Sequence, residues 1–421
     1  MSDKKKLVLA YSGGLDTSFC LKYLTEDRQF DVHTVIVNTG GFSSEELRKI
    51  EEKARMLGAK SHTALDVQNE YYSKFIRYMI FGNILKNNTY PLSVSSERTV
   101  QAAAIVNFAK EIGATHIAHG STGAGNDQVR FDMVFNILDP EVEVVTPIRD
   151  MQLSRNYEIE YLTGKGVDID TKKMAYSINK GLWGTSVGGE ETLTSKNPLP
   201  DSAYPSQPVK DGTEQLTLGF TNGELLQVNG LAFDSPVSAI REIESKASAY
   251  AVGRDIHVGD TILGIKGRVG FEAGAPLVII KSHHALEKHV LTKWQLYWKE
   301  QLANWYGMLL HEAQYLDPVM RDIERFLEST QAHVSGKVYV KLSPYRFSID
   351  GIESEYDLMT SDFGEYGEIN KQWTANDVKG FTKILGLPSS IYNHVAGKVD
   401  RKNTVQYNMV GGDKGFYSMG H

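Results

Sequence analysis

The sequence has very little cysteine and no long apolar segment. Cys20 is the one cysteine in 421 residues, so no disulfide can form within the chain and no cysteine cluster can bind zinc. No apolar run approaches the roughly 18 residues that span a bilayer. The run that follows MSDKKK is too short for the core of a signal peptide. These absences predict a cytoplasmic protein that does not enter a membrane.

Basic charge and the common nucleotide motifs are also lacking. The net charge of −7 argues against a wide nucleic-acid surface and leaves small molecules as the expected partners. The sequence contains no G-x-x-x-x-G-K-[ST] loop and no G-x-G-x-x-G fingerprint. These absences exclude a Walker-type phosphate loop and a dinucleotide-binding fold of the usual kind.

The first 150 residues alternate strand-like and helix-like patterns. Apolar runs at LVLAYS, DVHTVIVNTG, SHTALDV, THIAHGS and EVEVVTPI are separated by helical periodicity, which predicts an α/β fold with a parallel sheet covered on both faces. The helix after DVHTVIVNTG has a capping box, Ser43 with Glu46. Ligands of such sheets lie beyond the carboxyl ends of the strands. The stretches YSGGLDTS and HGSTGAGN both lie at that edge.

The pattern changes after about Asp150. Two stretches predict β-hairpins, EQLTLGFTNGELLQV with its Asn-Gly turn and GKVYVKLSPYRFSID. One long helix is expected over 285–315, with an apolar stripe of Leu286, Val290, Trp294, Trp298 and Leu302 that packs in the core or between subunits. We expect an ATP-binding domain at 1–165, an α+β synthetase domain at 166–362 and an oligomerisation arm at 363–421, which contains a helix at 375–385.

The stretch YSGGLDTS is typical of a phosphate site. A glycine-rich turn between a strand and a helix offers backbone N–H groups at the positive end of the helix. Ser12, Thr17 and Ser18 add hydroxyl donors. Asp16 would repel phosphate, unless Mg²⁺ joins the carboxylate to the phosphates.

This loop resembles the S-G-G-x-D-[ST] loop of the N-type ATP pyrophosphatases, which split ATP between the α- and β-phosphates. HGSTGAGNDQVRF at 119–131 is similar to the H-G-x-T-G-x-G-N-D-x-x-R-F signature of the argininosuccinate synthase family. TPIRD, the pair Ser177 and Ser186, VGR at 252–254 and SGKVYVKL extend the resemblance over most of the chain. The resemblance implies that ATP activates the ureido oxygen of citrulline and that the amine of aspartate then displaces AMP.

The resemblance also implies roles for individual residues. Ser12, Asp16 and Asp127 would be catalytic, with Asp16 also at the Mg²⁺. ATP would contact Ala10, Tyr11, Ser12, Gly13, Gly14, Leu15, Asp16, Thr17, Ser18, Val37 and Gly120. Aspartate would be held by Thr122, Asn126 and Asp127. Citrulline would be held by Tyr90, Ser95, Asn126, Arg130, Ser177 and Ser186. A homotetramer in the cytoplasm and a role in arginine biosynthesis are implied as well.

The chain departs from the family around the second substrate. Gly259 stands where the family has the Glu of an E-N-R triplet, and Phe271 where it has a citrulline-binding Tyr. The segment 93–99, SVSSERT, replaces G-T-S-L-A-R-P, and Ala124 replaces a Lys. Either another carboxylate (Glu97, Asp255 or Asp260) pairs with the α-ammonium of citrulline, or the substrate is an N-acylated citrulline, whose nitrogen is neutral.

Two other functions share parts of these patterns. A tRNA thiolase or lysidine synthetase carries a similar loop, but the lone Cys20 and the negative net charge fit it poorly. A nucleotide-binding protein that has lost catalysis is a third possibility, against which the two intact motifs argue. His283, His284 and His289 lack the spacing of a metal site and are expected to be packing or surface residues.

Overall fold

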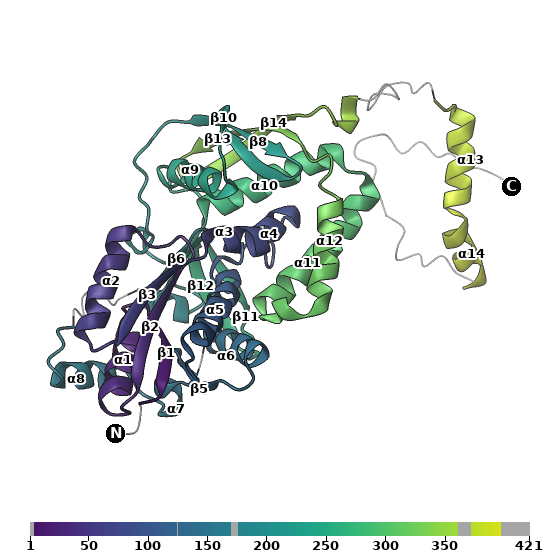
Figure 1. Cartoon of the computed structure of the whole chain (residues 1–421). Coiled ribbons are helices and arrows are strands. Elements are labelled where there is room, and N and C mark those ends of the chain that lie inside the picture. The colour runs from purple at the N-terminus through teal and green to yellow at the C-terminus, as the bar shows by residue number, and fades with distance from the viewer. Residues whose placement is uncertain (1–3, 124, 170–175, 361–371, 397–421) are drawn as a thin grey trace, which may run out of the picture. The chain divides into compact units, whose positions relative to one another are not determined.

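The computed structural model describes residues 4–123, 125–169, 176–360 and 372–396 (Figure 1). By its internal contacts the chain forms two units, Met1–Leu358 and Met359–His421. The boundary expected at residue 362 lies close to this division. The boundary expected at residue 165 falls inside the first unit and stays a prediction.

A parallel sheet forms the first part of the chain, as the alternating pattern predicts. The strand order is β3-β2-β1-β4-β5, and every neighbouring pair is parallel. Leu7 and Leu9 pack into one core and Val8 into another, because successive side chains of a strand point to opposite faces. The strands are β1 (Lys6–Ala10), β2 (Asp31–Asn38), β3 (Ser61–Asp66), β4 (His116–Ala118) and β5 (Glu143–Val145).

Helices cover both faces of this sheet (Figure 1). The capping box of Ser43 and Glu46 is present at the start of α2, which confirms that prediction. A π-helical turn at Tyr72–Ile76 joins α3 to α4. The helices of this part are α1 (Leu15–Glu26), α2 (Ser44–Met56), α3 (Gln68–Tyr71), α4 (Arg77–Phe81), α5 (Ser93–Ile112), α6 (Asn126–Leu138), α7 (Pro147–Asp150) and α8 (Arg155–Gly164).

Two antiparallel sheets follow, with strand orders β10-β9-β8-β13-β14 and β11-β12-β7-β6. Both predicted hairpins are confirmed, and Asn222 and Gly223 of the first have positive φ. The strands are β6 (Ser177–Gly181), β7 (Gly184–Gly188), β8 (Glu214–Thr221), β9 (Glu224–Val228), β10 (Leu231–Ala232), β11 (Arg254–Asp260), β12 (Lys266–Glu272), β13 (Gly336–Ser343) and β14 (Arg346–Glu353).

The single helix expected over 285–315 is wrong, because the chain forms two helices there. They are α10 (Gly274–Val290) and α11 (Lys293–His311). Thr292 starts the second helix with a capping box that includes Gln295. The break divides the apolar stripe, since Leu286 is buried in the core whereas Trp294 and Trp298 are exposed. The other helices of the first unit are α9 (Pro236–Ser248) and α12 (Pro318–Ser329).

The second unit contains the expected helix, α13 (Ala375–Leu385), and a further helix, α14 (Leu387–Val395). Both expose a series of apolar side chains: Val378, Phe381, Ile384, Leu385, Leu387, Ile391, Tyr392 and Val395. In the described part of the second unit these side chains have no core to enter.

Candidate active site

A cavity of about 1090 Å³ opens at the carboxyl edge of the parallel sheet. Its wall includes residues of both antiparallel strand pairs β6–β7 and β11–β12, as well as the amino-terminal parts of α5 and α6. Most residues that the resemblance implies lie in this wall: Ala10, Tyr11, Ser12, Gly14, Leu15, Asp16, Thr17, Val37, Tyr90, Ser95, Gly120, Thr122, Asn126, Asp127, Arg130, Ser177, Ser186 and Gly259.

Three of the implied residues lie behind the wall. Gly13 has φ +77° and lets the loop turn into α1. Ser18 is fully buried and donates to the carbonyl of Gly14 at 2.6 Å. Phe271 is also fully buried, with its ring 5.4 Å from that of Tyr90. These residues support the wall from the protein side.

The two glycine-rich stretches meet at the entrance to α1. A Cβ on Gly120 would lie 3.2 Å from the backbone carbon of Asp16, so the glycine permits a close approach of the two loops. Ser12 and Thr17 face each other across the first loop, with 3.4 Å between their hydroxyl oxygens. The loop therefore offers hydroxyl groups and the positive end of α1 to the same part of the cavity.

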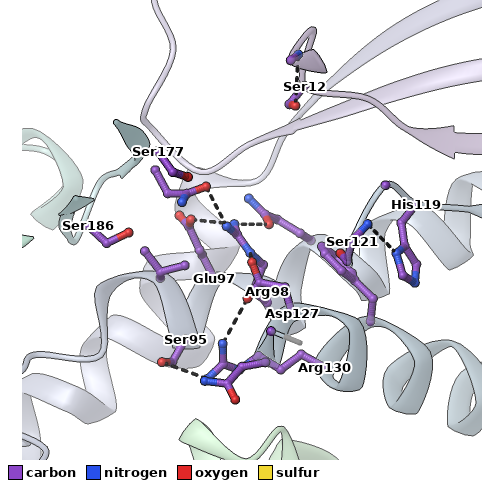
Figure 2. Close-up of a pocket in the computed structure, with 18 of the residues that line it drawn as sticks. Ser12, Ser95, Glu97, Arg98, His119, Ser121, Asp127, Arg130, Ser177 and Ser186 are labelled. Atoms are coloured by element: carbon purple, nitrogen blue, oxygen red, sulfur yellow. Dashed lines mark hydrogen bonds and ion pairs between the residues drawn. The ribbon is translucent and has the colours of Figure 1, made fainter. Parts of the chain in front are cut away.

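His119, which opens the second stretch, is held by a chain of charged groups. Its Nε2 lies 2.8 Å from Asp132 of α6, and Asp132 pairs with Arg149 of TPIRD at 2.5 Å. Its Nδ1 accepts from the backbone N–H of Ser121 (Figure 2). TPIRD thus fixes the glycine-rich loop through α6.

Asp16 lies beside a second carboxyl group, Glu158 of α8. Burial and the neighbouring Asp16 raise the pKa of Glu158 to about 8. Burial also raises the pKa of Asp16, against the effects of Glu158 and Arg155. Two carboxyl groups of this kind lose their protons together when a divalent cation neutralises them. The described residues contain no group of three or more His, Cys, Asp and Glu side chains that could hold a metal alone.

Four charged side chains form a connected network along the cavity (Figure 2). Arg98 donates from Nη1 to Oε1 of Glu97 at 2.9 Å and from Nε to Oδ2 of Asp127 at 3.0 Å. Arg130 donates from Nη1 to Oδ1 of Asp127 at 3.1 Å. Each oxygen of the Asp127 carboxylate therefore faces a different guanidinium group.

This network separates the pKa values of its two carboxyl groups. Burial raises the pKa of Glu97 to about 7, although Arg98 and the hydroxyl of Thr39 oppose the change. Burial would raise the pKa of Asp127 too, but Arg98 and Arg130 outweigh it and hold that pKa below its usual value. Asp127 is thus the carboxylate of this network that stays ionised at neutral pH.

The orientation of Arg130 depends on residues far along the chain. Its Nε and Nη2 donate to the backbone carbonyl of His311 at 3.1 and 3.0 Å, and Nη2 also donates to Ser95 at 3.2 Å. Nδ1 of His311 lies 3.1 Å from the Ser95 hydroxyl. Burial, followed by Arg130, lowers the pKa of His311 to about 3. Nε and Nη2 of Arg130 are therefore occupied by the protein, and Nη1 keeps one N–H for a ligand beside its bond to Asp127.

The β6–β7 hairpin carries Ser177 and Ser186 into the cavity. Its turn rests against the loop that follows β2, where the N–H of Leu182 donates to the carbonyl of Thr39 at 2.9 Å. Arg98 donates from Nη2 to Asn179 of β6 at 3.0 Å. A Cβ on Gly41 would lie 1.9 Å from the carbonyl oxygen of Lys180. The hairpin therefore fits against the loop that follows β2 without room for one extra carbon.

The residues expected to replace the family's carboxylate differ in position. Glu97 and Asp260 line the cavity, but Asp260 is exposed and pairs with Lys266 at 2.7 Å. Asp255, an exposed residue of β11, is absent from the described wall of the cavity. Ala124 lies outside the described residues. Glu97 is the buried carboxyl group among these candidates.

Several residues of the site are not marked by any motif. Arg98, Asn179, His257 and His311 line the cavity or hold residues that do. The neighbouring charges Glu97 and Arg98 interrupt the small and apolar stretch YPLSVSSERTV. Charged groups inside such a stretch need partners when it is buried, and that signal points to a polar site.

Comparison with known proteins supports one family over both halves of the chain. The model of the "Arginosuccinate synthase N-terminal HUP domain" matches residues 6–168, and that of the "Arginosuccinate synthase C-terminal domain" matches residues 176–392. The chain belongs to the argininosuccinate synthase family. The resemblance of the sequence motifs is thereby confirmed.

Curated relatives of the family match at similar levels. The argininosuccinate synthase of Methanocaldococcus jannaschii is 36% identical over 388 residues, 91% of this chain and 97% of the relative. That of Xanthomonas axonopodis pv. citri is 36% identical over 406 residues, which are 94% of this chain and 96% of the relative. That of Dictyoglomus turgidum is 35% identical over 398 residues, which are 94% of this chain and 99% of the relative.

These matches do not favour the alternatives, which were a tRNA-modifying enzyme and a ligase for an N-acylated citrulline. None of the helices in the described part of the chain has both the length and the apolar character needed to cross a bilayer. His283 is fully buried and bonded to Asn83 and Gln331, as expected of a packing histidine.

Proposed function

We propose that this chain joins citrulline to aspartate with ATP, giving argininosuccinate, AMP and pyrophosphate through a citrullyl-adenylate. The observation that carries the proposal is the single cavity in which both glycine-rich stretches, Arg130 and the serines of the β6–β7 hairpin meet. Family membership supports the same reaction. The reaction supplies a step of arginine biosynthesis.

The chemistry asked of the protein is alignment and charge compensation. Ser12, Thr17 and the start of α1 hold the phosphates, Asp127 holds the amino group of aspartate, and Asn126 donates to its carboxylate. Citrulline lies against Tyr90, Arg130 and the hairpin serines. Closure of the hairpin over the loop excludes water, which would hydrolyse the adenylate.

Mg²⁺ fits Asp16, which lines the cavity, because this ion is commonly held by one or two carboxylates together with substrate phosphates. The bound ion would neutralise charge on the departing pyrophosphate. Asp16 would be its ligand in the loop, and Glu158 orients Asp16 from α8.

Pyrophosphate release tests the proposal. We expect release that requires ATP, citrulline, aspartate and Mg²⁺ together, and Asp16→Asn to reduce kcat/KM at least about 100-fold, since charge compensation at the phosphates would be lost. Asp322→Asn is the matched control, because Asp322 pairs with Arg325 on the exposed face of α12. Pyrophosphate release that does not depend on citrulline, or that occurs only with N-acetyl- or N-succinyl-citrulline, would contradict the proposed reaction.

We also propose that the protein works in the cytoplasm as a homotetramer joined through its carboxyl-terminal arm. The exposed apolar side chains of α13 and α14 support this, because apolar faces of this extent usually meet a partner. Light scattering should give a mass close to four chains for the full protein. Phe381→Glu together with Ile391→Glu should lower that mass, and an unchanged mass would overturn the role of the arm.

A further inference from the structure

His257 occupies a place in the cavity wall that no motif assigns. It lies in the middle of β11, and its ring stacks on that of Tyr90 with 5.1 Å between centroids and 23° between planes. The hydroxyl of Tyr90 accepts from Ser93 at 3.1 Å and from the backbone N–H of Val94 at 3.0 Å. Tyr90 is thus fixed at the start of α5, and it fixes the imidazole in turn.

Gly259 follows His257 by two residues on the same strand, so both face the cavity. A Cβ on Gly259 would lie 2.6 Å from Nε2 of His257. The φ of Gly259 is not in the left-handed region, so the backbone alone does not require glycine. The glycine is needed because the imidazole fills the space that a side chain at 259 would take.

The imidazole of His257 is a neutral hydrogen-bonding group open to a ligand. Burial and the positive charge of Lys86 lower its pKa. Neither ring nitrogen bonds to another described residue. Nε2 of His311 is fully buried without a partner, but neither nitrogen of His257 is. Lys86 lies on the loop before Tyr90, and its pKa is itself lowered by burial. A neutral N–H donor close to an ammonium group suits an anionic oxygen.

We propose that His257 is a specificity-determining residue that hydrogen bonds a carboxylate oxygen of the ureido amino acid, and that Gly259 provides the room for its ring. This inference rests on the proposed function. It assigns the carboxylate of citrulline to the side of the cavity that Tyr90 and His257 line, within the electrostatic influence of Lys86. The α-ammonium group then points toward Glu97, the buried carboxyl group of the cavity wall.

Two substitutions at His257 distinguish the hydrogen bond of its imidazole from the stacking of its ring on Tyr90. His257→Phe keeps the stacking on Tyr90 but removes both nitrogens, and it should raise the KM of citrulline about 10- to 100-fold, as expected for a lost hydrogen bond to a charged group. The KM values of ATP and aspartate should stay within about twofold of wild type, because the lost hydrogen bond is one to citrulline. His257→Gln restores a polar group and should recover part of the lost affinity.

A double-mutant cycle tests the link to Gly259. Gly259→Ala should raise the KM of citrulline about tenfold in the wild-type background but have little effect in the His257→Ala background, where the ring is gone. Gly351→Ala is the matched control, because nothing lies within 4 Å of a Cβ at that site on β14. Thermal unfolding of each variant verifies that it is folded.

The outcomes separate this inference from the proposed function. Wild-type enzyme that releases no citrulline-dependent pyrophosphate would overturn both. Active wild-type enzyme whose citrulline KM is unchanged by His257→Phe would overturn only the role of His257. Equal increases in the KM of all three substrates, or an equal effect of Gly259→Ala in both backgrounds, would also overturn it.

Discussion

Asp127→Asn is expected to reduce kcat/KM at least about 100-fold, because the groups proposed to hold the amino-acid substrates would shift. The asparagine amide must present its NH₂ group to one of the two guanidinium groups, Arg98 or Arg130, that now share the carboxylate. Arg130 is buried, with 3% of its side chain exposed. Leaving such a charge unpaired costs about 3 kcal/mol. Steady-state kinetics and urea unfolding measure the two effects.

The same change at an exposed ion pair provides the comparison. Asp322→Asn removes the partner of Arg325, and both side chains are largely exposed. Such pairs contribute less than about 1 kcal/mol, and α12 contributes nothing to the described cavity wall. An Asp127→Asn variant with the stability and kinetics of the Asp322→Asn variant would show that the network does not position the site.

Gly41→Ala adds one methyl group at the contact with the β6–β7 hairpin, and we expect it to reduce both activity and stability strongly. The new Cβ would lie 1.9 Å from the carbonyl oxygen of Lys180, and the backbone bond from Leu182 to Thr39 holds the two segments together nearby. The hairpin must move, and Ser177 and Ser186 move with it. We expect a loss of kcat/KM of about 100-fold and of about 1–3 kcal/mol in unfolding free energy.

The pattern of the loss distinguishes displacement of the hairpin from general damage. The KM of citrulline should rise more than that of ATP, because the serines of the hairpin belong to the proposed citrulline side. Gly351→Ala, where the added carbon meets no atom within 4 Å, should leave kinetics and stability near wild type. Equal KM values for wild type and Gly41→Ala would mean that the hairpin tolerates a shift without consequence for the substrate.

The local structure of the chain follows closely from local patterns. The alternation of apolar runs and helical periodicity predicts the parallel sheet, and Asn222-Gly223 predicts a hairpin that the structure contains. The error at α10 and α11 has a local cause as well. Thr292 and Gln295 form a capping box, so a start signal was present inside an apolar stripe that otherwise continues at helical spacing.

Part of the candidate site could likewise be predicted from the sequence, and part could not. Its two glycine-rich stretches are visible in the sequence, because close backbone approach and a helix start demand particular residues at fixed spacing. The partners that set charge and orientation are not visible in this way. Arg130 is held by His311, 181 positions later, and Arg98 reaches Asn179, 81 positions later.

The sheet, the glycine-rich loop before α1 and the family can thus be predicted from the sequence, since each depends on residues that are neighbours along the chain. The folded arrangement was needed to show which carboxylate of the charged network stays ionised, how Arg130 is oriented, and why Gly259 accompanies His257. The physical reason is that a pKa, a hydrogen-bond direction and a steric fit depend on every group that surrounds a side chain. Folding draws those groups from distant parts of the sequence.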